Sequence, residues 1–186
     1  MIYSLSLGAA FATVGALLVI FGLFALLRRS TLQSWLRTLP RSREWGYGLL
    51  AVVTVWSWWL IRTIDLGEFD NWRIRVLIAI PIAAILTARY VDELLAARAI
   101  GMLLLLAAEP LLESAFLQPE LSRLFLVSFV YAGIVIGMFW IGMPYLMRDQ
   151  IQWFSNSERR WNTGALTSIL YGGVLLICCL TLHRSS

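Results

Sequence analysis

The stretch LLLLAAEPLLESAF, residues 103–116, has the composition of a helix within a lipid bilayer, yet it carries two carboxylates. Six apolar runs of this kind divide the chain, and each is close to the length of about 17–25 residues that crosses a bilayer. Their approximate bounds are 2–27, 45–64, 74–90, 99–117, 124–147 and 165–182. We therefore expect an all-α, polytopic transmembrane bundle that forms a single domain over residues 1–186.

The composition supports a membrane protein. Of the 186 residues, 60% are hydrophobic and 14% are charged, whereas a soluble domain carries about 25% charged residues. Six spans leave no room for a separate soluble domain. The first apolar run exceeds the about 7–15 residues of a signal-peptide core and is followed at once by Arg28 and Arg29, so we expect it to be kept as a span.

The distribution of arginines predicts the orientation of the spans. The loop at 28–44 holds five arginines against Glu44 alone, whereas the loop at 65–73 is mainly acidic. Because positively charged loops stay in the cytoplasm, residues 28–44 are expected inside and residues 65–73 outside. Both termini then face outward. We therefore expect a multi-pass protein of a bacterial cytoplasmic (inner) membrane, in contact with the lipid bilayer.

A short helix is predicted over about residues 30–39, in the cytoplasmic loop after the first span. Its apolar side chains recur at the spacing of one helical face, and Pro40 ends it. The members of this stripe are Leu32, Trp35, Leu36 and Leu39. We expect the helix to lie on the membrane surface. The alternative is a helix that presents the same stripe to a partner protein.

Small residues predict where helices pack closely. Gly8, Gly15 and Gly22 are spaced seven residues apart in the first span, and Gly133 and Gly137 form a G-x-x-x-G pair in the fifth. Close backbone approach over glycine favours helix association in lipid. These glycines are therefore expected at helix contacts, either within the chain or with another protein.

Two sequence features bear on the cytoplasmic side. The Gly142-Met143-Pro144 segment predicts a bend near the inner end of the fifth span. The loops at 28–45 and 148–161 also resemble each other, with SREW in the first and SERRW in the second. A duplicated helical hairpin and a chance similarity both explain this resemblance.

The two carboxylates form the candidate polar site. Glu109 is expected near the bilayer centre and Glu113 one turn further out on the same face. Arg62 lies at the depth of Glu113 in the second span, which predicts an ion pair between them. For Glu109 several roles stay open: a protonated or hydrogen-bonded group, a contact with another subunit, or a site that binds a proton or cation.

The sequence excludes several kinds of chemistry. All 15 basic residues are arginines, so no lysine is present to form a Schiff base. The adjacent Cys178 and Cys179 match no zinc spacing, and the single histidine, His183, excludes a bis-histidine haem. No cofactor or metal site is expected, and the arginines are too scattered for nucleic-acid binding.

Two function classes remain. We expect a non-catalytic integral membrane subunit that anchors, stabilises or assembles a larger membrane complex, with other membrane proteins as partners. The alternative is a small transporter or ion-conducting subunit that uses Glu109 and Glu113. The first is favoured because two carboxylates are few for a transport pathway.

Overall fold

The computed structural model describes residues 5–90, 93–118 and 120–185, with side chains described as far as Leu182. The start of the first predicted span, at residues 2–4, and the C-terminal Ser186 lie outside these residues. The described chain is helical and contains no strand. Its helices are α1 (Leu7–Leu27), α2 (Arg29–Thr38), α3 (Arg43–Thr63), α4 (Arg73–Tyr90), α5 (Leu95–Ala115), α6 (Arg123–Gly142), α7 (Tyr145–Ser155) and α8 (Glu158–Ser185). Two 3₁₀ turns, η1 (Leu39–Arg41) and η2 (Gly67–Trp72), precede α3 and α4.

Local sequence signals explain several helix ends. The hydroxyl of Ser6 accepts a hydrogen bond from the Ala9 backbone and caps α1, and Ser42 caps α3 in the same way through Trp45. At the bend, α6 ends at Gly142, and Pro144 stands at the position just before the first residue of α7. The predicted span at 124–147 is corrected accordingly: it comprises α6 and the first turn of α7.

Five helical segments are long and apolar enough to cross a membrane: α1, η2 with α4, α5, α6 and α8. The sequence predicted six spans, and the remaining one corresponds to α3, which has the length but does not reach the hydropathy of the others. Its polar side chains and its tryptophans lower its mean hydropathy. The structure therefore supports a multi-pass membrane protein with at least these five helices.

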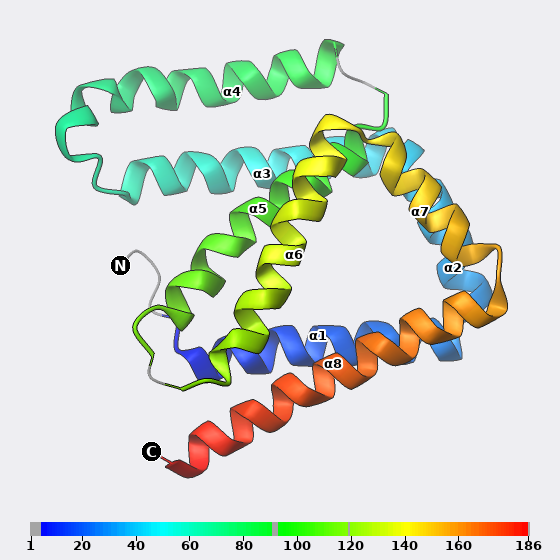
Figure 1. Cartoon of the computed structure of the whole chain (residues 1–186). Helices are drawn as coiled ribbons and strands as arrows, with labels where there is room; N and C mark the ends of the chain where they lie inside the picture. The colour runs from blue at the N-terminus through cyan, green and yellow to red at the C-terminus, as the bar shows by residue number, and fades with distance from the viewer. Residues whose placement is uncertain (1–4, 91–92, 119, 186) are drawn as a thin grey trace.

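The long helices form three antiparallel pairs (Figure 1). Helix α1 packs along α8, α5 packs along α6, and α3 packs against α4. Helix α3 also contacts α5, which joins the α3–α4 pair to the rest of the molecule. The short helices α2 and α7 lie side by side where α1 ends and α8 begins.

Glycines allow the closest helix contacts. A Cβ atom on Gly15 of α1 would lie 2.9 Å from the carbonyl oxygen of Gly172 in α8, and one on Gly172 would lie 2.7 Å from that of Gly15. Gly101 of α5 and Gly137 of α6 oppose each other in the same reciprocal way, at 2.7 and 2.9 Å. At Gly22 a Cβ atom would lie 2.6 Å from the Ile169 side chain.

The other two glycines singled out in the sequence lie elsewhere. A Cβ atom at Gly8 or Gly133 would meet no other atom within 4 Å. The contacts of Gly15, Gly22 and Gly137 are all made within the chain, with α8 and α5 as the neighbours. Two reciprocal glycine crossings are therefore formed, one between α1 and α8 and one between α5 and α6.

Polar side chains of α8 reinforce these contacts by donating hydrogen bonds to backbone carbonyl groups of neighbouring helices. The donors and acceptors are Ser168 and Leu18 at 2.9 Å, Tyr171 and Phe125 at 2.7 Å, Cys179 and Gly8 at 3.3 Å, and the buried indole of Trp161 and Ala25 at 2.9 Å. Such bonds are favourable in a bilayer because lipid tails offer no partner for a hydroxyl or an indole N–H group. Helix α8 is thus bonded to α1 and α6 along its length.

Candidate functional site

The two carboxylates of the predicted polar site lie on α5, and both are half-buried. Glu109 follows the buried Ala108, and Glu113 precedes the buried Ser114, whose hydroxyl donates to the carbonyl oxygen of Leu111. Among the described residues, the carboxylate of Glu109 forms neither a hydrogen bond nor an ion pair. None of the three cavities described below is lined by either glutamate. The pair therefore lies along the side of α5 and not in one of these cavities.

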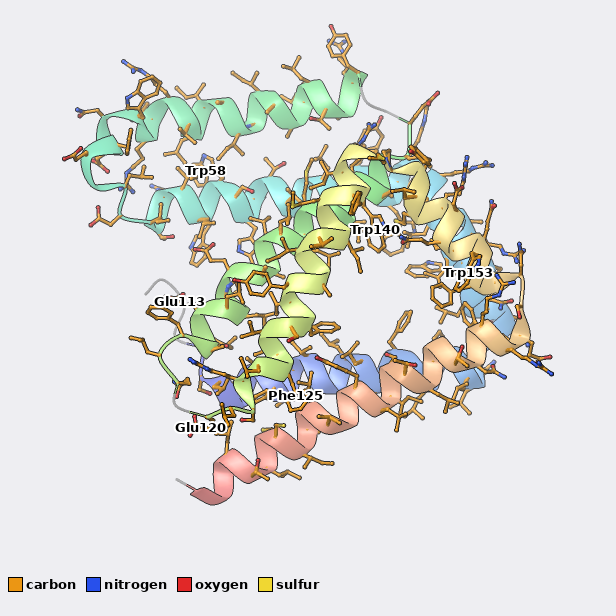
Figure 2. The ribbon with its side chains drawn as sticks, in the orientation of Figure 1. Trp58, Glu113, Glu120, Phe125, Trp140 and Trp153 are labelled. Atoms are coloured by element: carbon orange, nitrogen blue, oxygen red, sulfur yellow. The ribbon has the colours of Figure 1, made fainter. Side chains whose placement is uncertain are left out.

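The predicted ion pair between Arg62 and Glu113 is not formed. The guanidinium of Arg62 lies over the ring of Trp58, 5.1 Å from its centroid. Figure 2 shows Trp58 on α3 and Glu113 on α5, two helices that diverge beyond their contact. The buried residues of α3 are Gly46, Leu50 and Val53, and Arg62 projects roughly 150° away from them around the helix axis. Arg62 and Glu113 were matched by their depth along α3 and α5, but the two side chains do not lie on facing sides of these helices.

The apolar stripe of α2 is also corrected, because much of it packs inside the protein and not against lipid. Leu32 is 4% exposed and packs with Ala25, Trp161 and Ala165, and Leu36 packs against this cluster. Leu39, in η1, is 5% exposed and packs with Ala97 and Met147. Trp35 is 41% exposed and makes an edge-to-face contact with Trp45 at 5.9 Å. The stripe therefore has partners within its own chain, in α1, α5, α7 and α8.

A polar cavity of about 280 Å³ lies between α2, η1 and α7, and we call it the arginine cavity. Its lining residues are Leu36, Arg37, Pro40, Arg41, Arg148, Ile151, Gln152 and Asn156. Arg37 donates to the side-chain oxygen of Asn156 at 3.5 Å, and Arg148 pairs with Asp149 at 2.9 Å. Arg41 forms no hydrogen bond or ion pair within the described chain. The cavity therefore gathers three cationic groups, and no acidic side chain is among its lining residues.

An apolar cavity of about 300 Å³ adjoins it, and we call it the aromatic cavity. Leu36 and Ile151 line both cavities and form their shared wall. The remaining lining residues come from α1, α6, α7 and α8: Phe21, Ala25, Trp140, Met147, Gln150, Phe154, Trp161, Gly164 and Ala165. Trp140 lies near the junction of α6 and α7, where its indole donates to the side-chain oxygen of Gln150 at 3.0 Å (Figure 2).

A third cavity, of about 390 Å³, lies on the other side of Arg41 and Arg148. Its remaining lining residues are Arg43, Glu93 and Leu94. Arg41 and Arg148 therefore stand between two polar cavities. In the sequence these arginines served only as signals of orientation. The resemblance between the loops at 28–45 and 148–161 was the one sequence signal that related Arg41 to Arg148. In the structure, both loops contain a short helix between two long ones.

Within the described ranges, no group of three or more His, Cys, Asp or Glu side chains is placed to hold a metal ion. Comparisons of the chain with protein families, with curated proteins and with solved structures find no match. The helices, their exposed faces and the cavities are therefore the features that indicate a function.

Proposed function

We propose that the chain is a non-catalytic subunit that anchors or stabilises a larger protein complex in a bacterial inner membrane. The observation that supports this proposal is the projecting α3–α4 pair, which we call the arm. No residue of α4 is buried, and no residue of α3 beyond Val53 is buried. The arm and the α1–α8 pair lie on opposite sides of α5 and α6 (Figure 1), and the arm contacts α5 through α3, whose buried residues all lie in its first half.

The hydropathy of the arm argues that protein, and not lipid alone, covers it. Of the five helical segments that qualify as spans, the one containing α4 has the lowest mean hydropathy and the smallest buried share. Helix α3 falls below the hydropathy of all five. In a self-sufficient bundle the least apolar helices are expected at the centre, where neighbouring helices shield their polar groups from lipid. Here they form the most exposed pair.

The outer side of α4 offers a regular surface to a partner. Ile74, Ile78, Ile82 and Ile85 are each at least half exposed and recur at spacings of three or four residues, which places them on one face of the helix. Packing between helices in lipid depends on close van der Waals contact along such a face. We propose that a helix of a different membrane protein packs against this isoleucine face.

Site-specific photo-crosslinking tests the proposal. A photoreactive residue at Ile78 is expected to capture one membrane protein in native membranes, at a yield near one partner per chain. The matched control is the same residue at Leu170 of α8, which is 70% exposed and lies outside the arm. Capture of lipid only, capture of a second copy of the chain, or equal capture from both positions contradicts the proposal. Ion transport by the purified chain alone also contradicts it.

The proposed topology has six spans, with α3 as the second and with both termini outside. The three long helix pairs support it, because the ends of these helices that α2 and α7 join lie on one side of the molecule (Figure 1). In a background with Cys178→Ala and Cys179→Ala, a cysteine at Glu68 is expected to react with an impermeant maleimide in intact cells. Cysteines at Ser42 and Ser157 should react only after the membrane is opened. Labelling of Ser42→Cys in intact cells contradicts this topology.

A further inference from the structure

We propose that the arginine cavity and the aromatic cavity together bind one anionic phospholipid. The headgroup phosphate lies among Arg37, Arg41 and Arg148, and part of an acyl chain enters the aromatic cavity past Leu36 and Ile151. This inference goes beyond the proposed function, and it rests on a different part of the molecule from the arm. It assigns a ligand to the layer formed by α2 and α7.

The charges of the arginine cavity suit a phosphate group. Three guanidinium groups line it and no acidic side chain does. Asp149 is bonded to Arg148, and Glu93 lines the third cavity on the other side of Arg41 and Arg148. Arg37 has only the neutral Asn156 as a partner, at 3.5 Å, and Arg41 has none among the described residues. Guanidinium groups bind phosphate oxygens through paired N–H donors, and an anion among them also relieves the repulsion between neighbouring cations.

The adjoining aromatic cavity distinguishes a lipid from a free anion. Its walls are apolar apart from Gln150, whose side-chain oxygen is already bonded to Trp140. Its volume of about 300 Å³ is at the lower end of the about 300–1,000 Å³ that ligand pockets occupy. A phosphate with no acyl chain leaves this space without a ligand. A phospholipid fills both cavities, because the polar and the apolar space adjoin at Leu36 and Ile151.

The position of the site fits the inner surface of a bilayer. The site lies where α1, α6 and α8 begin or end at α2 and α7 (Figure 1), and the proposed topology places these helix ends, with their arginines, at the depth of lipid headgroups. Basic pockets between membrane helices on the cytoplasmic side bind anionic lipid headgroups in this way. The lipid then joins α2, which connects α1 to α3, with α7, which connects α6 to α8.

Quenching of tryptophan fluorescence by brominated lipid tests the proposal, because Trp140 and Trp161 line the aromatic cavity. The full chain in detergent micelles is titrated with phosphatidylglycerol that carries bromine on its acyl chains. We expect saturable quenching by this lipid and weak, non-saturating quenching by brominated phosphatidylcholine. The double variant Arg37→Gln/Arg41→Gln should weaken binding about tenfold or more. The control Arg28→Gln/Arg159→Gln removes the same charge from two exposed arginines outside both cavities and should bind as the unaltered chain does.

A second variant tests the acyl-chain part of the site. Gly164 lines the aromatic cavity, and a Cβ atom there would lie 3.2 Å from the edge of the Phe154 ring. Gly164→Leu fills part of the cavity and should reduce lipid binding while the helix content, checked by circular dichroism, stays unchanged. Equal quenching by the two lipids, or an arginine double variant that binds normally, overturns the proposal. Displacement of the lipid by millimolar inorganic phosphate, together with normal binding by Gly164→Leu, assigns the arginines to free phosphate and overturns it as well.

Discussion

Replacing Gly137 by leucine is expected to separate α6 from α5, whereas the same replacement at Gly133 leaves the two helices together. The two positions are one turn apart on α6 and differ in what lies opposite. A Cβ atom at Gly137 would lie 2.9 Å from the backbone oxygen of Gly101, but one at Gly133 would meet nothing within 4 Å. A backbone atom of a packed helix cannot move aside as the end of a flexible side chain does. The helices must therefore shift as whole bodies.

The expected loss of stability for Gly137→Leu is about 3 kcal/mol, because the close van der Waals contact along α5 and α6 is lost with the crossing. Thermal unfolding in detergent, followed by size-exclusion chromatography, measures this loss. Gly133→Leu should unfold within a few degrees of the unaltered chain, since leucine is a better helix former than glycine. If the two variants unfold at the same temperature, the crossing at Gly137 does not hold the helices together.

Most of the helices could be predicted from the sequence because lipid imposes simple rules on a chain. A run of apolar residues long enough to cross the bilayer must be helical, since every backbone group needs a partner within the segment. The run at 74–90 therefore matches α4 (Arg73–Tyr90) closely. Pro144 indicated the end of α6, and the spacing of Gly15 and Gly22 indicated the side of α1 that faces α8. Each of these signals can be read from a single helix without knowing which helices are its neighbours.

The relative placement of helices could not be predicted in the same way. Depth in the membrane follows from position along one helix, but the direction of a side chain depends on which neighbours that helix meets. Arg62 and Glu113 were matched by depth alone, and Arg62 points away from α5. Gly101 stands alone in its segment and forms no motif, yet it is the partner of Gly137. Its role becomes visible only when α5 and α6 are placed together.

The arginine cavity could not be predicted for the same reason, because its residues come from two loops that are far apart in the sequence. Arg37 and Arg41 precede α3, and Arg148 follows α6, so more than a hundred residues separate them. The positive charge of each loop was explained by membrane orientation, which needs no contact between the loops. The stripe of α2 was likewise expected to face lipid, because the sequence did not indicate which helices of the same chain would cover it. The contact between α2 and α7 brings the arginines of the two loops together in one cationic cavity.

The arm that supports the proposed function depends on one arginine, which the sequence did not single out. The guanidinium of Arg73 donates to backbone oxygens at the end of α3: to Arg62 at 2.8 Å, to Ile61 at 3.3 Å and to Ile64 at 2.9 Å. Its Nε atom also donates to Asp70 at 2.8 Å. The last carbonyl groups of a helix have no partner within the helix. Arg73, at the start of α4, supplies partners for them and so fixes the turn between α3 and α4.

Arg73→Gln is therefore expected to destabilise the arm by about 2–4 kcal/mol, since hydrogen bonds to a charged group contribute about 1.5–3 kcal/mol each and these bonds act together. The matched control is Arg75→Gln, which removes the same charge two residues away. Arg75 lies over the Trp72 ring at 4.8 Å, an exposed cation–π contact worth about 0.5–1 kcal/mol. Amide hydrogen exchange over residues 60–75 measures the opening of the turn and should increase strongly only in Arg73→Gln.

The same pair of variants connects the turn to the proposed partner. If a partner helix packs against the isoleucine face of α4, loss of the turn should lower the photo-crosslink yield from Ile78 in Arg73→Gln and leave it unchanged in Arg75→Gln. Arg73→Lys keeps the charge but lacks the planar set of donors that reaches several carbonyl groups at once, so it should restore only part of the yield. An unchanged exchange pattern in Arg73→Gln would show that the turn holds without the guanidinium. If the turn opens and the cross-link yield stays unchanged, partner binding at the isoleucine face does not depend on the turn between α3 and α4.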